Sequence, residues 1–433
     1  MIQAIVERCA GIDIGKKSVA VCLMVGAADQ EPTVEFRSYS TFTAELERMK
    51  EWLLQAGCRQ VLMESTGAYW KPILNILEGS LEVYLANAED VRGRKGHKTD
   101  KEDSWWLAHL WRHGMVRTSF IPSRPVRELR DLTRRRKQLL KMATSEKNRI
   151  QKVLEDANVK LSSVLSDVFG VSGQLMLEAL LEGKLESQQI AEFAQRRARQ
   201  KIPEIAASLE GHRFNEHHRW LIGQNLELLR ALEQQLIELD EQILRRIEQA
   251  GYLKQMQLLE TIPGIQRDSA VVILAETGPE LKQFPTAGQL SSWAGVCPGN
   301  KRSAGKNLGG HITRGNRWLR AALTESAWAV AHTKRGPLRE KYWRLQAGGK
   351  KRALIAVAHA LLVVIHRVLT SGQPYQPSEA QPMEESKRLR MIRHHVRCLG
   401  RLGISAGPML AASRPYRTKT RVRKAEDKST LKS

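Results

Sequence analysis

Four carboxylates in the first quarter of the chain have the residue types and the spacing of a metal site. They are Asp13, Glu64, Asp100 and Asp103. The last two lie three positions apart in a segment predicted to be helical, so they share one helix face. Mg²⁺ prefers oxygen ligands, usually a few from protein and the rest from water or phosphate, and Mn²⁺ accepts similar ligands. Taken singly, each residue could instead form a turn, cap a helix or interact with a helix dipole. Their combined order predicts a divalent-metal site that could stabilise the entering and leaving oxygens of a phosphoryl transfer.

A second candidate group is the hydroxyl of Ser303, in segment 294–316. This segment holds six glycines and one proline in 23 residues, which excludes a long helix or an uninterrupted strand. A serine hydroxyl is a weak nucleophile that needs a base, a metal or positive charge nearby. The basic residues near it are Lys301, Arg302, Lys306, Arg314 and Arg317. The hydroxyls that compete for the same role are Ser291, Ser292 and Thr313.

Alternating strand and helix patterns surround the carboxylates. Apolar runs predict strands at 10–14, 18–24, 34–40, 59–64 and 81–86. Helical spacing predicts helices at 43–56, 70–77 and 100–113. This order indicates an α/β domain with a mixed sheet. Because Asp13 and Glu64 each lie near the end of a strand, they could meet Asp100 and Asp103 across one end of that sheet.

Two long helices are predicted further along the chain, at 125–157 and 218–249. Their apolar residues recur at spacings of three and four, which favours either an antiparallel hairpin or a coiled coil between two chains. The segment between them predicts an insertion of shorter helices. The basic run Arg134, Arg135 and Arg136 could bind the phosphates of a nucleic-acid backbone. A helix face that is exposed to solvent explains the same residues equally well.

The region after residue 255 is expected to be mainly helical. Ile262-Pro263-Gly264-Ile265, between two apolar runs, is similar to a helix–hairpin–helix, which offers backbone N–H groups to a DNA phosphate. A tight turn between packed helices explains the same residues. Further helices are predicted at 316–332 and 350–369. Segment 386–433 has 14 Lys or Arg against two acidic residues, which predicts a disordered tail that binds polyanions.

Composition limits the class of protein. A chain of 433 residues with 42% hydrophobic residues predicts several domains, and a net charge of +23 predicts a nucleic-acid partner. Five scattered cysteines without a C-x-x-C pair argue against a disulfide framework and a zinc ribbon. No secretory signal or membrane span is expected, since polar residues interrupt the apolar run 353–369, so we expect a soluble cytoplasmic protein. The expected domains are 1–122, 123–254, 255–372 and 373–433.

Several motifs together resemble a known family. GIDIGKKSVAV, VLMESTGAYW and KTDKEDSWWLA resemble the Asp-Glu-Asp-Asp domain of insertion-sequence transposases that use a RuvC-like nuclease fold. TIPGI, FPTAGQLSSWAGVCPG, SAGK and TRGNRWLR are similar to the second domain of that family. The matches cover residues 5–115 and 255–335. They imply an RNase H/RuvC-like N-terminal domain followed by a second, serine-containing transposase domain.

The resemblance also implies an activity and partners. Asp13, Glu64, Asp100 and Asp103 match the family's metal-binding carboxylates, and Ser303 matches a serine that forms a covalent phosphoserine link to DNA. The family is similar to a system in which an element-encoded guide RNA pairs with target and donor DNA. Members of that kind act as dimers of dimers, with the carboxylates of one subunit near the serine of another. The resemblance therefore implies a homodimer or homotetramer that acts on double-stranded DNA in the bacterial cytoplasm, associated with the nucleoid. The chain departs from the pattern at Ala304, where many relatives have glycine.

Three other functions fit parts of the pattern. A metal-dependent, junction-resolving nuclease would need the carboxylates but not Ser303. A nucleic-acid-binding protein with an inactive site would need only the positive charge. An actin-like phosphotransferase is suggested by GIDIG, which is similar to a first phosphate loop, but the chain has no second loop of the D-x-G-G kind.

Overall fold

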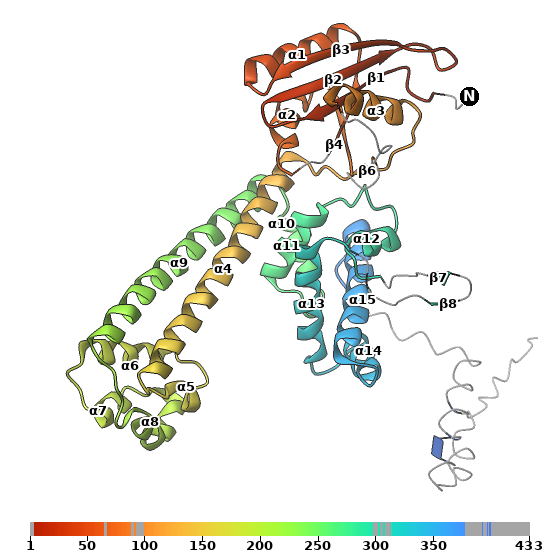
Figure 1. The fold of residues 1–433 in the computed structure, drawn as a ribbon. Helices are drawn as coiled ribbons and strands as arrows, with labels where there is room; N and C mark the ends of the chain where they lie inside the picture. The colour runs from red at the N-terminus through yellow and green to blue at the C-terminus, as the bar shows by residue number, and fades with distance from the viewer. Residues whose placement is uncertain are drawn as a thin grey trace, which may run out of the picture.

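The computed structural model describes residues 4–64, 67–87, 91, 99–297, 302–303, 306–307, 312 and 314–376, and positions 392, 396, 398 and 399. Its N-terminal part is a six-stranded sheet in the order β3-β2-β1-β4-β5-β6 (Figure 1). The strands are β1 (Arg8–Ile14), β2 (Ser18–Val25), β3 (Thr33–Ser40), β4 (Gln60–Glu64), β5 (Glu82–Ala86) and β6 (Thr118–Ser119). β4 and β5 run parallel to β1, whereas β2, β3 and β6 are antiparallel to their neighbours.

Alternate residues of β1 point to opposite faces of the sheet, and this alternation fixes where the helices pack. Ala10 and Ile12 lie in the core that includes residues of two helices, α1 (Thr43–Gln55) and α2 (Trp70–Leu77). Cys9 lies instead in a cluster with Ala108 of α3 (Asp100–Arg112). The predicted mixed α/β sheet is confirmed, and it fits an RNase H-like domain. β6 was not predicted, because a two-residue strand shows no alternation.

The middle of the chain is a helical arm. Its elements are α4 (Arg124–Asp156), α5 (Leu161–Val164), α6 (Val171–Glu182), α7 (Ser187–Ala191), η1 (Arg196–Lys201), α8 (Ile202–Leu209) and α9 (Glu216–Gln249). α4 and α9 pack along each other as an antiparallel pair (Figure 1). At the end of the pair that carries the short helices α5 to α8, Leu154 clusters with Ile222. At the opposite end, Leu129 clusters with Ile243. Within one chain, the two predicted long helices therefore pack on each other.

The C-terminal part is a second helical unit. Its elements are α10 (Leu253–Glu260), α11 (Arg267–Thr277), α12 (Ala287–Trp293), β7 (Arg302–Ser303), β8 (Lys306–Asn307), α13 (Arg317–Ala331), α14 (Pro337–Gln346) and α15 (Lys350–Ser371). Leu129 and Ile243 from the helical arm belong to its core, so the arm is anchored in this unit. The domain limits at residues 122, 254 and 372 remain predictions.

α10 and α11 are joined by a tight turn at Gly264, which has a φ of +82°. A Cβ at Gly264 would lie 2.7 Å from the carbonyl oxygen of Ser326, so the turn packs closely against α13. Its likeness to a helix–hairpin–helix remains a prediction.

α15 is long and apolar enough to cross a membrane by length and composition. Its residues Val357, Leu361 and Ile365 nevertheless lie in the C-terminal core, against the other helices. α15 therefore serves as a core helix in this structure. The basic tail predicted for residues 373–433 lies, after Gln376, outside the described residues apart from four single positions.

Candidate active site

Asp13 of β1 and Glu64 of β4 lie side by side at the same end of two parallel strands. Gly11 pairs with Leu62, and the same register two residues on places Asp13 beside Glu64. Neighbouring strands are about 4.8 Å apart, and residues in register point to the same face. Leu62 packs against Leu107 of α3, so Asp13 and Glu64 face that helix as well. The sequence prediction that the two carboxylates meet at a sheet end agrees with this geometry.

α3 lies directly on β1 because Gly11 has no side chain. A Cβ at Gly11 would lie 2.2 Å from the carbonyl oxygen of Ser104 and 2.3 Å from the backbone nitrogen of Ala108. Strand and helix are therefore in backbone contact at this point. Asp100 and Asp103 are in the first turn of the same helix, near the end of the sheet where Asp13 lies.

Local sequence explains why α3 begins at Asp100. The Oγ1 atom of Thr99 accepts a hydrogen bond from the backbone nitrogen of Glu102 at 3.2 Å, and it donates one to the Glu102 carboxylate at 3.1 Å. Acidic residues in a first helical turn also interact favourably with the helix dipole. Capping and the helix dipole therefore explain the acidic first turn of α3 without a metal ion. What points to a metal site is instead the effect of Asp100 and Asp103 on the ionisation of Asp13.

The carboxylates of Asp103, Asp100 and Glu64 oppose the ionisation of Asp13. Burial, followed by the charges of Asp103, Asp100 and Glu64, raises the pKa of Asp13 from 3.8 to about 6. A bound cation would relieve this repulsion, and an all-oxygen donor set suits Mg²⁺ or Mn²⁺. Among the described residues, no three Asp, Glu, His or Cys side chains converge on one point. Mg²⁺ commonly binds only one or two carboxylates and takes its other ligands from water and phosphate.

A cavity of about 470 Å³ lies beside Asp100, between α3 and the outer strands. Arg37 and Lys101 line it, and the Lys101 ammonium lies 4.4 Å from the centre of the Phe36 ring. Sequence reasoning missed both basic residues. Lys101 could have been found, because it stands among the acidic residues of KTDKED, whereas Arg37 on a solvent-facing strand gave no signal.

The segment that carries Ser303 is closed at its base by backbone contact. A Cβ at Gly315 would lie 2.4 Å from the backbone nitrogen of Gly295, and the backbone nitrogen of Asn316 donates to the carbonyl of Trp293 at 3.2 Å. Beyond this base, β7 and β8 pair as a short hairpin in which Ser303 is opposite Lys306. We call segment 295–315 the serine loop. The hairpin lies well apart from the sheet that carries Asp13 (Figure 1).

The competing hydroxyls are placed differently. Ser291 is fully buried in α12, so it cannot reach DNA in this structure, and its hydroxyl has no hydrogen-bond partner among the residues that the structure describes. Ser292 is exposed on the same helix. Thr313 and Lys301 lie outside the described residues, and for Ser303, Arg302 and Lys306 only the backbone is described.

Both halves of this site match transposase family models. The transposase model of the IS110 group, defined by an Asp-Glu-Asp-Asp domain, matches residues 10–159, which include all four carboxylates. The model described as "Transposase IS116/IS110/IS902 family" matches residues 256–344, which include Ser303. The chain belongs to the IS110 transposase family.

Curated relatives of this family member include two insertion-element proteins. An uncharacterized 43.6 kDa protein of insertion element IS110 from Streptomyces coelicolor is 34% identical over 123 residues, which are 28% of this chain and 30% of that protein. The putative transposase y4pF/y4sB from Sinorhizobium fredii is 29% identical over 222 residues, which are 49% of this chain and 50% of that protein. The chain thus spans half or less of the length of each relative.

The basic residues predicted from the sequence to contact nucleic acid fall into two groups where the structure describes their side chains. Arg135, Arg314 and Arg317 are exposed. Arg134 and Arg136 instead form ion pairs within the protein, Arg134 with Glu276 at 2.9 Å, and Arg136 with Asp240 at 2.5 Å and Asp268 at 3.0 Å. Contact with nucleic acid remains a prediction for all five, and the exposed group is the more available for it.

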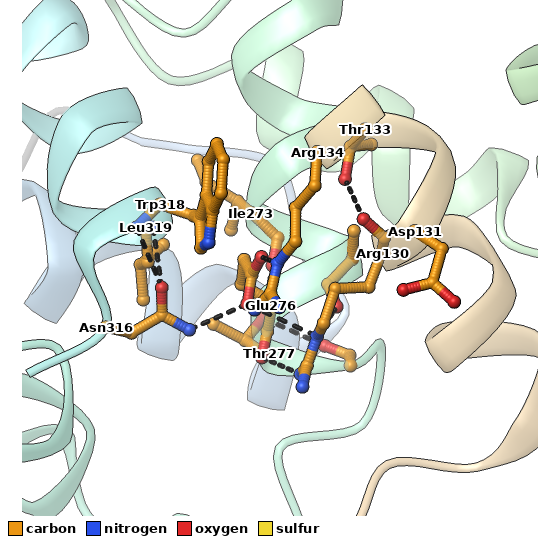
Figure 2. Close-up of polar contacts among 12 residues, drawn as sticks. Arg130, Asp131, Thr133, Arg134, Ile273, Glu276, Thr277, Asn316, Trp318 and Leu319 are labelled. Carbon is orange, nitrogen blue, oxygen red and sulfur yellow. Dashed lines mark hydrogen bonds and ion pairs between the residues drawn. The ribbon is translucent and has the colours of Figure 1, made fainter. Parts of the chain in front are cut away.

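Sequence reasoning also missed a polar cluster at the base of the serine loop. It consists of Arg130, Arg134, Glu276 and Asn316, which come from α4, α11 and the residue before α13 (Figure 2). Two signals were available. Glu276 follows the apolar run AVVILA, where an acidic residue needs a partner, and Asn316 precedes a helix, where asparagine is a favoured cap.

Proposed function

We propose that the chain is a DNA transposase that cuts and rejoins strands to excise and insert a mobile element. In this proposal Asp13, Glu64, Asp100 and Asp103 hold divalent ions, and Ser303 is the nucleophile. The observation that carries it is the placement of Asp13 and Glu64 side by side at one sheet end, with Asp100 and Asp103 near enough to oppose the ionisation of Asp13, because such a group favours a cation. The net charge of +23 supports double-stranded DNA as the substrate.

Each reacting group has a defined task. The Oγ atom of Ser303 bonds to phosphorus while one deoxyribose oxygen leaves as a free hydroxyl, which takes up the serine proton. A second DNA hydroxyl then attacks the phosphoserine and returns a proton to Oγ, so no phosphodiester bond is lost to water. Divalent ions, when bound, would stabilise charge on the entering and leaving oxygens. Basic residues of the serine loop and of α13 would balance the phosphate charge.

The two halves of this site lie on separate parts of one chain. In line with the family resemblance, we extend the proposal to a homodimer or homotetramer in which the carboxylates of one subunit act with Ser303 of another. We further propose that an element-encoded guide RNA reads the DNA sequence, in line with the family resemblance. The positive charge spread along the protein supports this proposal. Base pairing with the RNA would select the DNA sequence, while the protein would bind the sugar-phosphate backbone and the shape of the DNA.

The test is a denaturing gel of purified protein with its RNA, a labelled DNA site and Mg²⁺. Wild-type protein is expected to give a protein–DNA adduct, and Ser303→Ala is expected to give none. Ser292→Ala removes an exposed hydroxyl near the same loop and serves as the matched control, with wild-type adduct expected. Asp13→Asn should abolish the adduct without loss of DNA binding.

One outcome would replace the proposal. The carboxylates lie together within one chain and apart from Ser303, an arrangement that a junction-resolving nuclease would also have. Cleavage that survives in Ser303→Ala but disappears in Asp13→Asn would support that nuclease and exclude the serine mechanism. DNA binding without any cleavage by the wild-type protein would indicate an inactive enzyme.

A further inference from the structure

The buried carboxylate of Glu276 joins three elements at the base of the serine loop. Glu276 is fully buried on α11, and its two oxygens accept hydrogen bonds of 2.9 Å each from Nε and Nη2 of Arg134. Asn316 donates its side-chain amide to Oε2 at 2.7 Å, and Nε of Arg130 lies 3.2 Å from the same oxygen (Figure 2). A buried carboxylate is stable only when it is paired in this way.

Asn316 uses both ends of its side chain. While its amide nitrogen binds Glu276, its Oδ1 atom caps α13 by accepting hydrogen bonds of 3.0 Å from the backbone nitrogens of Trp318 and Leu319. The preceding residue, Gly315, closes the loop against Gly295. The residue directly after the serine loop, Asn316, is therefore the one that binds Glu276.

The opposite side of the cluster belongs to α4, which is fixed to the carboxylate-bearing domain. Arg127, two turns before Arg134, binds Glu78 at the end of α2 through two hydrogen bonds of 2.9 and 2.7 Å. Arg130 also donates to the backbone carbonyls of Ala275 at 3.0 Å and Glu276 at 2.8 Å. A continuous set of charged contacts thus connects the N-terminal domain, through α4 and Glu276, to the loop base.

We propose that Glu276 is a positioning residue, which sets the base of the serine loop relative to α4 and thereby governs the placement of Ser303. This inference rests on the proposed function. Glu276 touches no reacting atom. It acts through Asn316, and its contact with Arg134 means that the loop base and the helical arm move together.

A reciprocal exchange tests the contact itself. Asn316→Asp keeps an acceptor for the cap of α13 but sets a second carboxylate against Glu276, where the amide now donates at 2.7 Å. Adding Glu276→Gln supplies an amide donor to the new carboxylate and leaves the formal charge of the cluster unchanged, although the amide also replaces a carboxylate oxygen that accepts from Nη2 of Arg134 and lies 3.2 Å from Nε of Arg130. We expect Asn316→Asp to slow adduct formation at saturating DNA about tenfold or more, and the double variant to recover part of that rate, because it removes the contact between two carboxylates. The DNA concentration at half-saturation should stay unchanged.

Glu325→Gln is the matched control. Glu325 also connects α13 to α4, through Lys137 at 2.5 Å, but its side chain is 60% exposed. Because exposed ion pairs contribute little, this variant should form adduct at the wild-type rate. A loss in the double variant equal to the sum of the losses in Asn316→Asp and in Glu276→Gln alone would overturn the inference, since additive losses would show no coupling between the two positions. A loss that appears only in DNA affinity would overturn it too.

A second readout separates this inference from the proposed function. Hydrogen exchange of the Trp318 and Leu319 amides reports on the loop base whether or not the protein reacts with DNA. Asn316→Asp should accelerate this exchange, and Glu276→Gln in the same chain should slow it again. If wild-type protein forms no adduct, the proposed function fails, and this exchange pattern alone decides the role of Glu276. Unchanged exchange in all variants would refute that role.

Discussion

Gly11 and Ala108 bring a strand and a helix into backbone contact. The position of a Cβ on Gly11 is only 2.3 Å from the backbone nitrogen of Ala108, a separation that no real side chain tolerates. This contact sets the height of α3 above β1, and the first turn of that helix carries Asp100 and Asp103. A single missing side chain thus controls how near two of the carboxylates lie to Asp13.

Gly11→Ala is predicted to impair both folding and metal-dependent activity. The added methyl group must push α3 away from β1, since it meets backbone atoms that cannot rotate aside. We expect the free energy of unfolding to fall by about 2 kcal/mol or more, as for other overpacked sites. Adduct formation should fall as well, and higher Mg²⁺ should restore part of it. Chemical denaturation and the gel assay measure the two effects.

The control for this substitution is Gly223→Ala. Gly223 lies inside α9, and a Cβ there would meet nothing within 4 Å. Because alanine favours helices over glycine by about 1 kcal/mol, this variant should be as stable as the wild type or more so. Equal stability of the Gly11 and Gly223 variants would contradict the packing argument.

The carboxylate half of the site could be predicted because its signals are local. Asp13 and Glu64 end apolar runs of strand length, and Asp100 and Asp103 begin a helix. The strand pairing then brings these signals together, as expected for a mixed sheet. What sequence could not supply is the closeness of α3 to β1. It depends on the backbone contact at Gly11, and a lone glycine in a strand has many explanations.

The pairing of the basic residues could not be predicted. Arg134 and Arg136 were expected either to bind phosphates or to face solvent. Each instead binds a carboxylate more than 100 positions away in the sequence. No spacing rule reports such a partner, because it follows from the packing of α4 against α11 and α9. The position of Ser303 relative to Asp13 could not be predicted from the sequence for the same reason.

Gly315→Ala is predicted to separate the two ends of the serine loop. A Cβ at this position would lie 2.4 Å from the nitrogen of Gly295 and 2.6 Å from the carbonyl carbon of Ala294. We expect adduct formation to fall about tenfold or more, because a nucleophile displaced by about 1 Å loses much of its rate. Gly288→Ala in α12, where the nearest atom would be 3.8 Å away, should react normally. Normal reaction of both variants would show that the loop base need not close.

Arg112 is predicted to be the main polar anchor of the N-terminal domain. It is 1% exposed. Its guanidinium donates to five carbonyl oxygens, those of Val6, Glu7, Gly26, Ala27 and Gln30. Arg112→Met should lower the free energy of unfolding by about 3 kcal/mol, since buried carbonyls lose charged donors. Arg112→Lys should recover only part of this lost stability. An ammonium group has three donors and lacks the flat, branched arrangement of donors in a guanidinium.

The exposed Arg117 provides the comparison for Arg112. Arg117→Met should change the stability by less than about 0.5 kcal/mol, as is usual for surface substitutions. Urea denaturation followed by circular dichroism measures all three variants. An Arg112→Met variant as stable as Arg117→Met would show that water replaces the guanidinium without cost.

The raised pKa of Asp13 predicts how stability depends on pH in the absence of metal. Its folded value is about 6, above the ordinary 3.8, so between these values the folded state binds more protons than the unfolded state. Stability must therefore fall as pH rises through this window, and the loss is complete above about pH 6. With EDTA present, Asp13→Asn should melt at a higher temperature than wild type at pH 7 and at nearly the same temperature at pH 3.5.

Mg²⁺ should cancel this difference, because a cation offsets the charges that oppose ionisation of Asp13. Added at pH 7, it is expected to raise the melting temperature of the wild type and to have less effect on Asp13→Asn. Glu51→Gln is the control, since Glu51 is exposed on α1, which packs on the face of the sheet opposite to α3. That variant should respond to pH and Mg²⁺ as the wild type does. A wild-type protein whose stability rose with pH relative to Asp13→Asn between pH 4 and 6 would show that the four carboxylates do not repel, and the case for a metal at this sheet end would be lost.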